Sequence, residues 1–228
     1  MIVTIDGPAG SGKSTAAREL ARRLGAAYLD TGAMYRAVAL RALRQGADLD
    51  DAEAMTRQAG EACLRLEASA DATRVMLDGE DVSTEIRSMR VTQATPYVAR
   101  VPDVRDALIA KQRQIGGELG SFVAEGRDQG STVFPEADVK FFLDATLEKR
   151  AQRRYRELHD DNESVDYGQV LEDLRQRDAN DRSRWAPLLV PGGAVRIDTT
   201  DMNVTEMVDL LEHEVKQRVP HARPPGSG

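Results

Sequence analysis

The chain has 228 residues, of which 41% are hydrophobic and 30% charged, an ordinary balance for a globular protein with one sizeable core and an added subdomain. Its formal charge of −7 argues against a general nucleic-acid-binding surface. The single cysteine, Cys63, allows no internal disulfide, and no apolar run is long enough for a membrane span or a signal segment. We therefore expect a cytoplasmic monomer that acts on neither nucleic acids nor membranes.

A glycine-rich segment follows an apolar, β-branched run at residues 2–5. It reads DGPAGSGKST from 6 to 15 and fits G-x-x-x-x-G-K-[ST]. Glycines in this pattern let main-chain N–H groups face a phosphate chain, and the following helix adds its free N-terminal donors. Lys13 supplies a mobile charge for the β- and γ-phosphates, and the Ser14 hydroxyl can ligate Mg²⁺. The predicted ATP site consists of Gly7, Pro8, Ala9, Gly10, Ser11, Gly12, Lys13, Ser14 and Thr15.

Strand and helix patterns then alternate along the chain. Gly25 closes the first helix, and Thr31 is a plausible cap for a helix over 33–45. Cys63 shares helical spacing with its neighbours, which predicts a buried packing residue. Strands are expected at 2–5, 26–29, 121–124, 139–143 and 195–197, and further helices at 50–64, 104–115, 146–158, 167–184 and 204–219. This order predicts an α/β fold, a doubly wound five-stranded parallel sheet with helices on both faces.

The alternation of strand and helix patterns is interrupted in the middle of the sequence. Residues 64–66 and 74–77 alternate in polarity as half-buried strands do, and Asp78-Gly79 is a tight-turn signal. We expect a small α+β insert with antiparallel strands at about 67–100. A mobile loop is predicted at 159–166 and a disordered tail at 220–228.

Arginines recur at helical spacing in two of the charged helices. Arg150, Arg153 and Arg154 share one helical face. Arg177, Asp181 and Arg184 share a face of the next helix. A solvated, salt-bridged surface is the alternative interpretation. Beside a phosphate loop in an acidic protein, the pattern favours binding of phosphoryl oxygens by a helical lid that excludes water.

A further group of arginines, Arg36, Arg105 and Arg127, lies at element boundaries where side chains can converge on a crevice. An alcohol acceptor would need a general base, for which Asp30, Glu125 or Asp128 could serve. A phosphate acceptor needs no base, because its second pKa is about 6 and it is already largely anionic. Many arginines, and no histidine near the predicted site, favour a phosphate acceptor.

Five stretches together resemble the bacterial cytidylate kinase family of nucleoside monophosphate kinases. They read ITIDGPAGSGKST, YLDTGAMYR, LDGEDVSTEIR, VAEGRDQGSTVFPEADVKFFLDA and RDANDRSR, and they occur in the family's order. The resemblance implies ATP-dependent phosphorylation of CMP and dCMP to CDP and dCDP, by direct in-line transfer with Mg²⁺. Small-molecule nucleotides are thus the expected partners.

The resemblance also implies roles for individual residues. Lys13, Arg150, Arg154 and Arg177 are the expected catalytic residues, with Arg150 and Arg154 as lid arginines that clamp the γ-phosphoryl group. Arg105 and Asp128 resemble the pair that reads the cytosine edge. The substrate-binding set is Thr31, Tyr35, Arg36, Arg105, Arg127, Asp128, Arg177, Asp181 and Arg184. The implied domains are a core P-loop domain (1–35, 101–148 and 185–219), a monophosphate-binding region (36–100) and a lid (149–184).

The chain departs from the family pattern at two places. The run after GRD is Gln129-Gly130-Ser131-Thr132, and the base pocket reads Thr95-Pro96-Tyr97 where a serine is common. Proline has neither an N–H nor a hydroxyl group to offer a base. Two other functions stay open on the residues alone: a P-loop kinase of a small hydroxylated metabolite, and a non-catalytic nucleotide-binding switch.

Overall fold

The protein forms two compact units along the chain. A computed structural model describes residues 1–160, 165–184 and 190–220, with side chains described throughout these ranges except at 159–160 and 180–184. Unit 1 comprises Met1–Gly25 and Val123–Gly228, and unit 2 is the continuous segment Ala26–Phe122. Unit 2 is therefore an insertion, in sequence, between the two segments of unit 1.

Five strands form the main sheet, in the order β2-β6-β1-β7-β8. Parallel pairing places Ile5 beside Phe141, and Phe141 beside Val195. Ile5 and Phe141 are fully buried, as expected for a parallel sheet covered by helices on both faces. The predicted doubly wound α/β fold is confirmed. The strand bounds are β1 Ile2–Asp6, β2 Ala27–Asp30, β6 Phe122–Gly126, β7 Val139–Asp144 and β8 Val195–Asp198.

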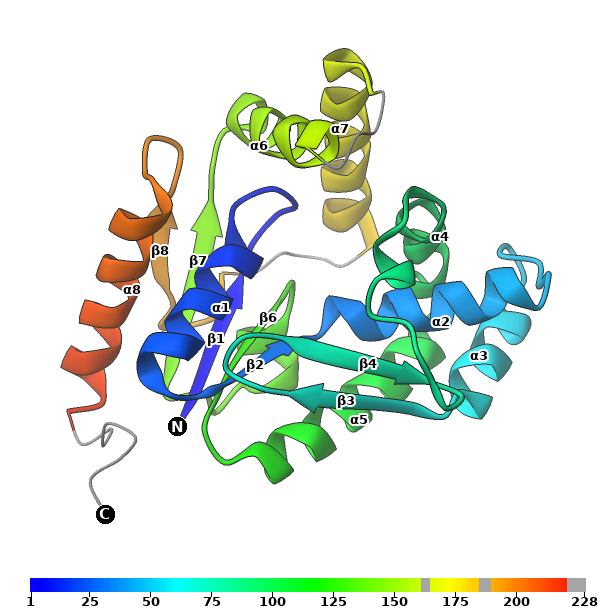
Figure 1. The fold of residues 1–228 in the computed structure, drawn as a ribbon, viewed down its shortest axis with the longest axis horizontal. Helices are drawn as coiled ribbons and strands as arrows, with labels where there is room; N and C mark the ends of the chain where they lie inside the picture. Colours follow the sequence, from blue (N-terminus) through cyan, green and yellow to red (C-terminus); the bar gives the residue numbers. More distant parts are fainter. Residues whose placement is uncertain (161–164, 185–189, 221–228) are drawn as a thin grey trace. The chain divides into compact units, whose positions relative to one another are not determined.

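Two pairs of helices belong to unit 1. Helix α1 (Lys13–Leu24) packs on α8 (Val204–Arg218), and these helices contact β1 and β7, respectively (Figure 1). Gly25 ends α1 in the left-handed conformation, with φ 59°, as predicted. Helices α6 (Leu147–Asp160) and α7 (Tyr167–Arg184) pack on each other beyond β7. All four helices confirm the sequence prediction to within a few residues.

The mobile loop and the disordered tail are not tested by this structure. Helix α6 continues to Asp160, and residues 161–164 of the predicted loop lie outside the described residues. The same is true of 221–228 in the predicted tail. Within the described ranges, none of the helices combines the length and the apolar character that crossing a bilayer requires.

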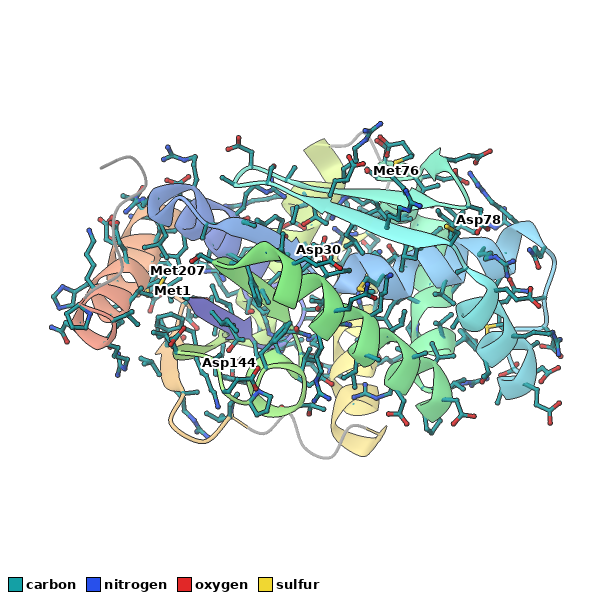
Figure 2. The ribbon with its side chains drawn as sticks, turned by 90° about the horizontal axis from the view of Figure 1, so that it is seen from below. Met1, Asp30, Met76, Asp78, Asp144 and Met207 are labelled. Carbon is teal, nitrogen blue, oxygen red and sulfur yellow. The ribbon has the colours of Figure 1, made fainter. Side chains whose placement is uncertain are left out.

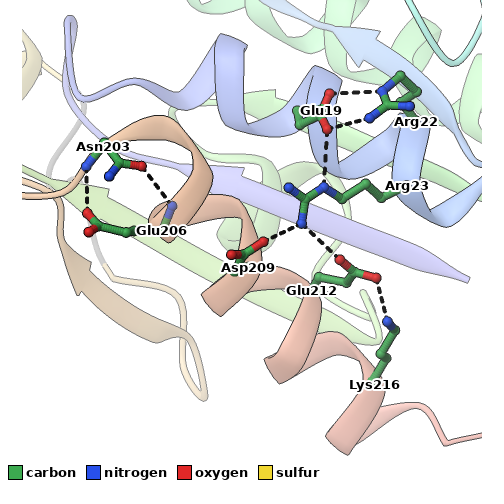
Figure 3. Close-up of polar contacts among 8 residues, drawn as sticks. All are labelled: Glu19, Arg22, Arg23, Asn203, Glu206, Asp209, Glu212 and Lys216. Atoms are coloured by element: carbon green, nitrogen blue, oxygen red, sulfur yellow. Dashed lines mark hydrogen bonds and ion pairs between the residues drawn. The ribbon is translucent and has the colours of Figure 1, made fainter.

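A cluster of charged side chains joins α1 to α8 (Figure 3). Arg23 donates to Glu19 on its own helix at 3.1 Å, and to Asp209 and Glu212 on α8 at 2.5 and 3.1 Å. Hydrogen bonds from Arg22 and then Arg23 lower the pKa of Glu19 to about 2. These groups are partly or fully exposed to solvent, so the cluster orients α8 on α1 more than it stabilises the fold.

Helix α8 begins with a capping box, also drawn in Figure 3. The Asn203 side chain accepts the Glu206 N–H at 3.0 Å, and the Glu206 carboxylate accepts the Asn203 N–H at 2.9 Å. Asn203→Ala removes the first bond and is expected to lower the free energy of unfolding by about 1 kcal/mol. Urea unfolding measures this loss. Asn203→Asp keeps the acceptor and should stay within experimental error of the wild type, whereas equal losses in both variants would contradict the capping role.

Unit 2 carries the antiparallel insert. Strands β3, β4 and β5 form a separate sheet in which Leu66 pairs with Val75, and β4 pairs with β5 across the predicted Asp78-Gly79 turn. The helix α4, which includes Pro96, has no counterpart in the prediction. The bounds in this unit are α2 Gly32–Arg44, α3 Ala52–Glu61, β3 Leu64–Ala68, β4 Thr73–Leu77, β5 Glu80–Asp81, a 3-10 turn Glu85–Arg87, α4 Met89–Ala99 and α5 Pro102–Leu119.

Two local predictions in unit 2 are wrong. Helix α3 stops at Glu61 instead of Leu64, and Cys63 is exposed instead of buried in a helix. The cause is tertiary: the Cys63 N–H donates to the Asp78 side chain at 2.9 Å, which starts the pairing of Leu64 with Leu77. Thr31 occupies the N-cap position of α2 without a side-chain cap bond. Asp30 takes that role, since its Oδ1 accepts the Ala33 N–H at 3.1 Å.

Candidate active site

The glycine-rich segment forms a tight loop between β1 and α1 in unit 1. Gly7, Gly10 and Gly12 have φ angles of 149°, 75° and 89°, which side chains rarely tolerate. A Cβ on Gly7 would lie 2.0 Å from the Leu143 carbonyl oxygen, and one on Gly10 would lie 2.9 Å from the Arg150 carbonyl oxygen. Backbone conformation thus favours glycine at all three positions, and close packing also requires it at Gly7 and Gly10. The predicted phosphate loop has the geometry that the motif implies.

Helix α1 starts without a side-chain cap, because glycine occupies its N-cap position. The N–H groups of its first turn have no acceptor within the helix and carry the positive end of the helix dipole. Lys13, the first residue of the helix, is 8% exposed and donates from Nζ to the Pro8 carbonyl at 2.7 Å. The ammonium group therefore lies against the loop, where an anion bound by the N–H groups would meet it.

Ser14 and Glu125 place two oxygen ligands side by side. The exposed Ser14 donates from Oγ to Glu125 Oε1 at 2.6 Å, and Glu125 is buried near the carboxyl end of β6. Hydroxyl and carboxylate oxygens suit Mg²⁺, which commonly takes one or two protein ligands together with substrate phosphates. Within the described residues, no group of three or more His, Cys, Asp or Glu could hold a metal by itself. The donor set fits a magnesium ion shared with a nucleotide.

Arg127 and the turn after it adjoin the phosphate loop. Arg127 is half-buried and donates from Nη1 to the Gly7 carbonyl at 2.9 Å. Asp128 precedes a π-helical turn, Gln129–Val133, which the sequence analysis did not predict. The turn falls on the run that departs from the family pattern, where the Asp128 carbonyl accepts the Thr132 N–H at 2.9 Å and the Val133 N–H at 3.2 Å.

Arg150 is the most enclosed of the arginines on α6, at 4% exposure. It forms a two-bond ion pair with Asp178 on α7, at 3.0 and 2.5 Å. It also donates to the Ala9 carbonyl of the phosphate loop at 3.2 Å and to the Ala145 carbonyl at 3.1 Å. The guanidinium thus connects the phosphate loop to both helices of the predicted lid.

The two neighbouring arginines of α6 differ in their surroundings. Arg153 donates to the Ser11 carbonyl at 3.3 Å and to Thr199 Oγ1 at 3.0 Å, and burial lowers its pKa. Arg154 pairs with Glu157 at 3.1 Å and keeps 30% of its side chain exposed. The sequence analysis placed Arg153 on the arginine face of this helix without assigning it a role in the site, and it did not identify Thr199. Thr199 directly follows β8, and the rule that ligands sit at the carboxyl ends of parallel strands could have indicated it.

Helix α7 carries the remaining site residues of unit 1. Arg177 is half-buried, one residue before Asp178. The side chains of Asp181 and Arg184 lie outside the part of the chain described, although the backbone confirms that both positions are helical.

Four predicted substrate-binding residues belong to unit 2. Thr31, Tyr35 and Arg36 lie together at the start of α2, where Thr31 and Tyr35 are buried at 2% and 9% exposure. Arg36 donates from Nη1 to Thr92 Oγ1 at 2.8 Å. Arg105 is half-buried near the start of α5. The structure thus brings three of the four together on one short segment.

Asp30, labelled in Figure 2, lies at the carboxyl end of β2, and both of its carboxylate oxygens are hydrogen-bonded. Oδ1 accepts the Ala33 N–H and Oδ2 pairs with Arg87 Nη2 at 2.9 Å. A carboxylate held in this way orders the start of α2 and is a poor candidate for a general base. The contacts of Glu125 with Ser14 likewise favour a ligand over a base.

The residues at the predicted base pocket lie within α4. The Thr95 hydroxyl donates to the Val91 carbonyl of its own helix at 2.7 Å. Pro96 follows inside the helix, and Tyr97 is 37% exposed with the Arg100 guanidinium 4.8 Å from its ring centre. In this conformation neither Thr95 nor Pro96 presents a free hydroxyl group.

Comparison with known proteins identifies the family. A cytidylate kinase family model matches residues 3–217. The cytidylate kinase of Caldanaerobacter subterraneus subsp. tengcongensis is 46% identical over 94% of each chain, and that of Mycolicibacterium paratuberculosis is 47% identical over 98% of each chain. A solved structure of an uncharacterized protein from Eubacterium ventriosum is 14% identical and aligns with a TM-score of 0.51 over 96% of this chain and 99% of its own, a likeness of fold alone. With the phosphate loop and its surrounding cations, these matches place the chain in the cytidylate kinase family.

Proposed function

We propose that this protein transfers the γ-phosphoryl group of ATP to CMP and dCMP, releasing ADP with CDP or dCDP. The observation that carries the proposal is the convergence of positive charge on the phosphate loop. Lys13, Arg127 and Arg150 each donate to a carbonyl of that loop, at 2.7, 2.9 and 3.2 Å. Such a site can hold two anionic phosphates against their mutual repulsion. Family membership supplies the identity of the nucleotide.

The phosphate loop would bind ATP through residues 7–15. Its N–H groups and those at the start of α1 would donate hydrogen bonds to the β- and γ-phosphate oxygens, and Lys13 would neutralise the charge that spreads over the transferring group. Ser14, with Glu125 beside it, would hold Mg²⁺, which would offset the negative charge of the nucleotide phosphates. The hydrogen bond between Ser14 and Glu125 supports this pairing.

The acceptor phosphate would be bound chiefly by arginines. A nucleoside monophosphate is largely dianionic at neutral pH, so no general base is required to activate it. The contacts of Asp30 support this view, because its carboxylate is occupied by Arg87 and the Ala33 N–H. The proposed acceptor ligands are Thr31, Tyr35, Arg36, Arg105, Arg127, Asp128, Arg177, Asp181 and Arg184, with Arg105 and Asp128 reading the cytosine edge.

Arg150, Arg154 and Arg177 would complete the catalytic set. We assign residues 149–184 to a lid, residues 36–100 to the monophosphate-binding region, and residues 1–35, 101–148 and 185–219 to the core domain. Arg154 is half-exposed and paired only weakly with Glu157, so it can turn to a phosphate at little cost. Arg150 would contact the transferring phosphoryl group either while it stays paired with Asp178 or after it has exchanged Asp178 for a phosphoryl oxygen. One cysteine and a charge of −7 favour a cytoplasmic monomer that acts on free nucleotides.

A coupled assay of ADP release tests the function. With ATP and Mg²⁺, CMP and dCMP are expected to be turned over at far higher kcat/KM than UMP or AMP. Shikimate-like alcohols serve as the matched acceptors for the alternative of a hydroxylated metabolite. Phosphorylation of an alcohol but not of CMP would establish that alternative. Tight nucleotide binding without phosphorylation of either acceptor would indicate a nucleotide-binding switch.

A further inference from the structure

Asp6 is a fully buried carboxylate to which the proposed chemistry gives no role. It is the last residue of β1 and directly precedes Gly7 of the phosphate loop. Its Oδ1 accepts the Gln129 N–H and its Oδ2 accepts the Gly130 N–H, both at 2.8 Å. These two donors begin the π-helical turn Gln129–Val133. One carboxylate therefore fastens that turn to the end of the first strand.

A second contact fastens the same segment from its other end. Arg127 donates to the Gly7 carbonyl at 2.9 Å, and Gly7 is the neighbour of Asp6 in the chain. Two consecutive residues thus hold both ends of segment 127–130. We propose that Asp6 is a positioning residue that fixes the Arg127 guanidinium beside the phosphate loop for the acceptor phosphate, an inference that rests on the role proposed above for Arg127.

The turn is packed closely against the first strand at Gly130. A Cβ on Gly130 would lie 2.7 Å from Thr4 Oγ1 and 3.1 Å from Pro191 Cγ. The turn is therefore pressed against β1 on one side and held by the Asp6 carboxylate at its start. When either contact changes, the turn has to shift, and the adjoining Arg127 shifts with it.

The charge state of Asp6 matters to this role. Burial raises the pKa of Asp6 to about 6, against the lowering effect of the two N–H donors. Among nearby charges, Asp128 raises this pKa and Lys13 lowers it. Both oxygens nevertheless accept an N–H, which is the hydrogen-bonding pattern of an ionised carboxylate. Asparagine has the same shape but only one acceptor oxygen, so its amide group would meet one of the two N–H donors.

Asp6→Asn is expected to raise the KM for CMP by about tenfold to a hundredfold at pH 7.5, because a buried N–H loses its acceptor and the turn moves. The KM for ATP should change much less, since other contacts brace the phosphate loop. Asp138→Asn is the matched control. That exposed carboxylate accepts the Ile2 N–H at 2.7 Å at the opposite end of β1, and its removal should leave both constants unchanged.

A double-mutant cycle separates positioning from general support of the fold. In an Arg127→Ala background, Asp6→Asn should raise the KM for CMP much less than in the wild-type background, because the main group through which it acts is gone. Equal rises in both backgrounds, or equal losses toward ATP and CMP, would overturn the proposal. Wild-type turnover of CMP in the same assay reports on the proposed function by itself.

Two further measurements test the proposal even if Asp6→Asn does not fold or has no activity. The added methyl group in Gly130→Ala would clash with Thr4 and displace the same turn, while the Asp6 carboxylate stays intact. We again expect a rise in the KM for CMP that is larger than any rise in the KM for ATP. An unchanged KM in Gly130→Ala would contradict the proposal even if Asp6→Asn did not fold. Amide NMR signals of Gln129 and Gly130 should shift in Asp6→Asn without any substrate, and their invariance would show that the carboxylate does not fix the turn.

Discussion

Lys13→Ala is expected to lower kcat by about a hundredfold to a thousandfold while leaving the protein folded. The ammonium group lies 2.7 Å from the Pro8 carbonyl, within the loop that would surround the ATP phosphates. Charge on the transferring phosphoryl group is met mainly by positioned cations, so a missing ammonium is not replaced by solvent. Steady-state ADP release with saturating CMP measures the effect, and circular dichroism verifies the fold.

Lys216→Ala provides the control for Lys13. This lysine, on α8, is 68% exposed and pairs with Glu212, so its removal changes the net charge of the protein equally but should leave kcat within about twofold. A Lys13→Ala enzyme with the turnover of the wild type would remove Lys13 from the mechanism.

Arg150→Met is expected to lower the free energy of unfolding by about 3–5 kcal/mol, because it leaves the Asp178 carboxylate without its partner. The side chains of Arg150 and Asp178 are only 5% and 13% exposed. The substitution also frees the Ala9 and Ala145 carbonyls. Urea unfolding gives the loss, and Arg154→Met, which breaks an exposed pair with Glu157, should cost less than about 1 kcal/mol.

The stability effect and any catalytic effect of Arg150 can be separated. Adding Asp178→Asn to Arg150→Met removes the buried unpaired charge and should recover much of the stability. If Arg150 also stabilises the transferring phosphoryl group, the double variant will be folded but still slow. Full activity in the stable double variant would show that Arg150 serves the structure alone.

The parallel sheet could be predicted because each of its signals is local. The apolar runs at β1 and β7, and the glycines that close α1 and open the phosphate loop, determine the backbone within a few residues. The failures have the opposite character. Cys63 fits a helical pattern, yet Asp78 and Leu77, more than ten residues away in sequence, draw it into extended structure. Helix α4 was missed because Pro96 argues against a helix until neighbouring elements hold it.

The composition of the site was predictable, but its contacts were not. The phosphate-loop motif identifies Lys13 and Ser14 by spacing alone, and arginines at helical spacing indicate α6 and α7. No spacing rule joins Arg150 to Asp178, which are 28 residues apart, or Asp6 to Gly130, which are 124 apart. These pairs depend on how two helices, or a strand and a turn, meet in three dimensions.

The carbonyl groups of the phosphate loop lead to one further consequence. Pro8, Ala9 and Ser11 each accept a hydrogen bond from a cationic side chain, supplied by Lys13, Arg150 and Arg153, respectively. In a trans peptide unit the oxygen of one residue and the N–H of the next point in opposite directions. Anchoring those oxygens therefore helps to set the directions in which the N–H groups of residues 9, 10 and 12 point before any nucleotide arrives. The N–H donors are therefore already oriented when a triphosphate binds, and binding requires little further ordering of the backbone.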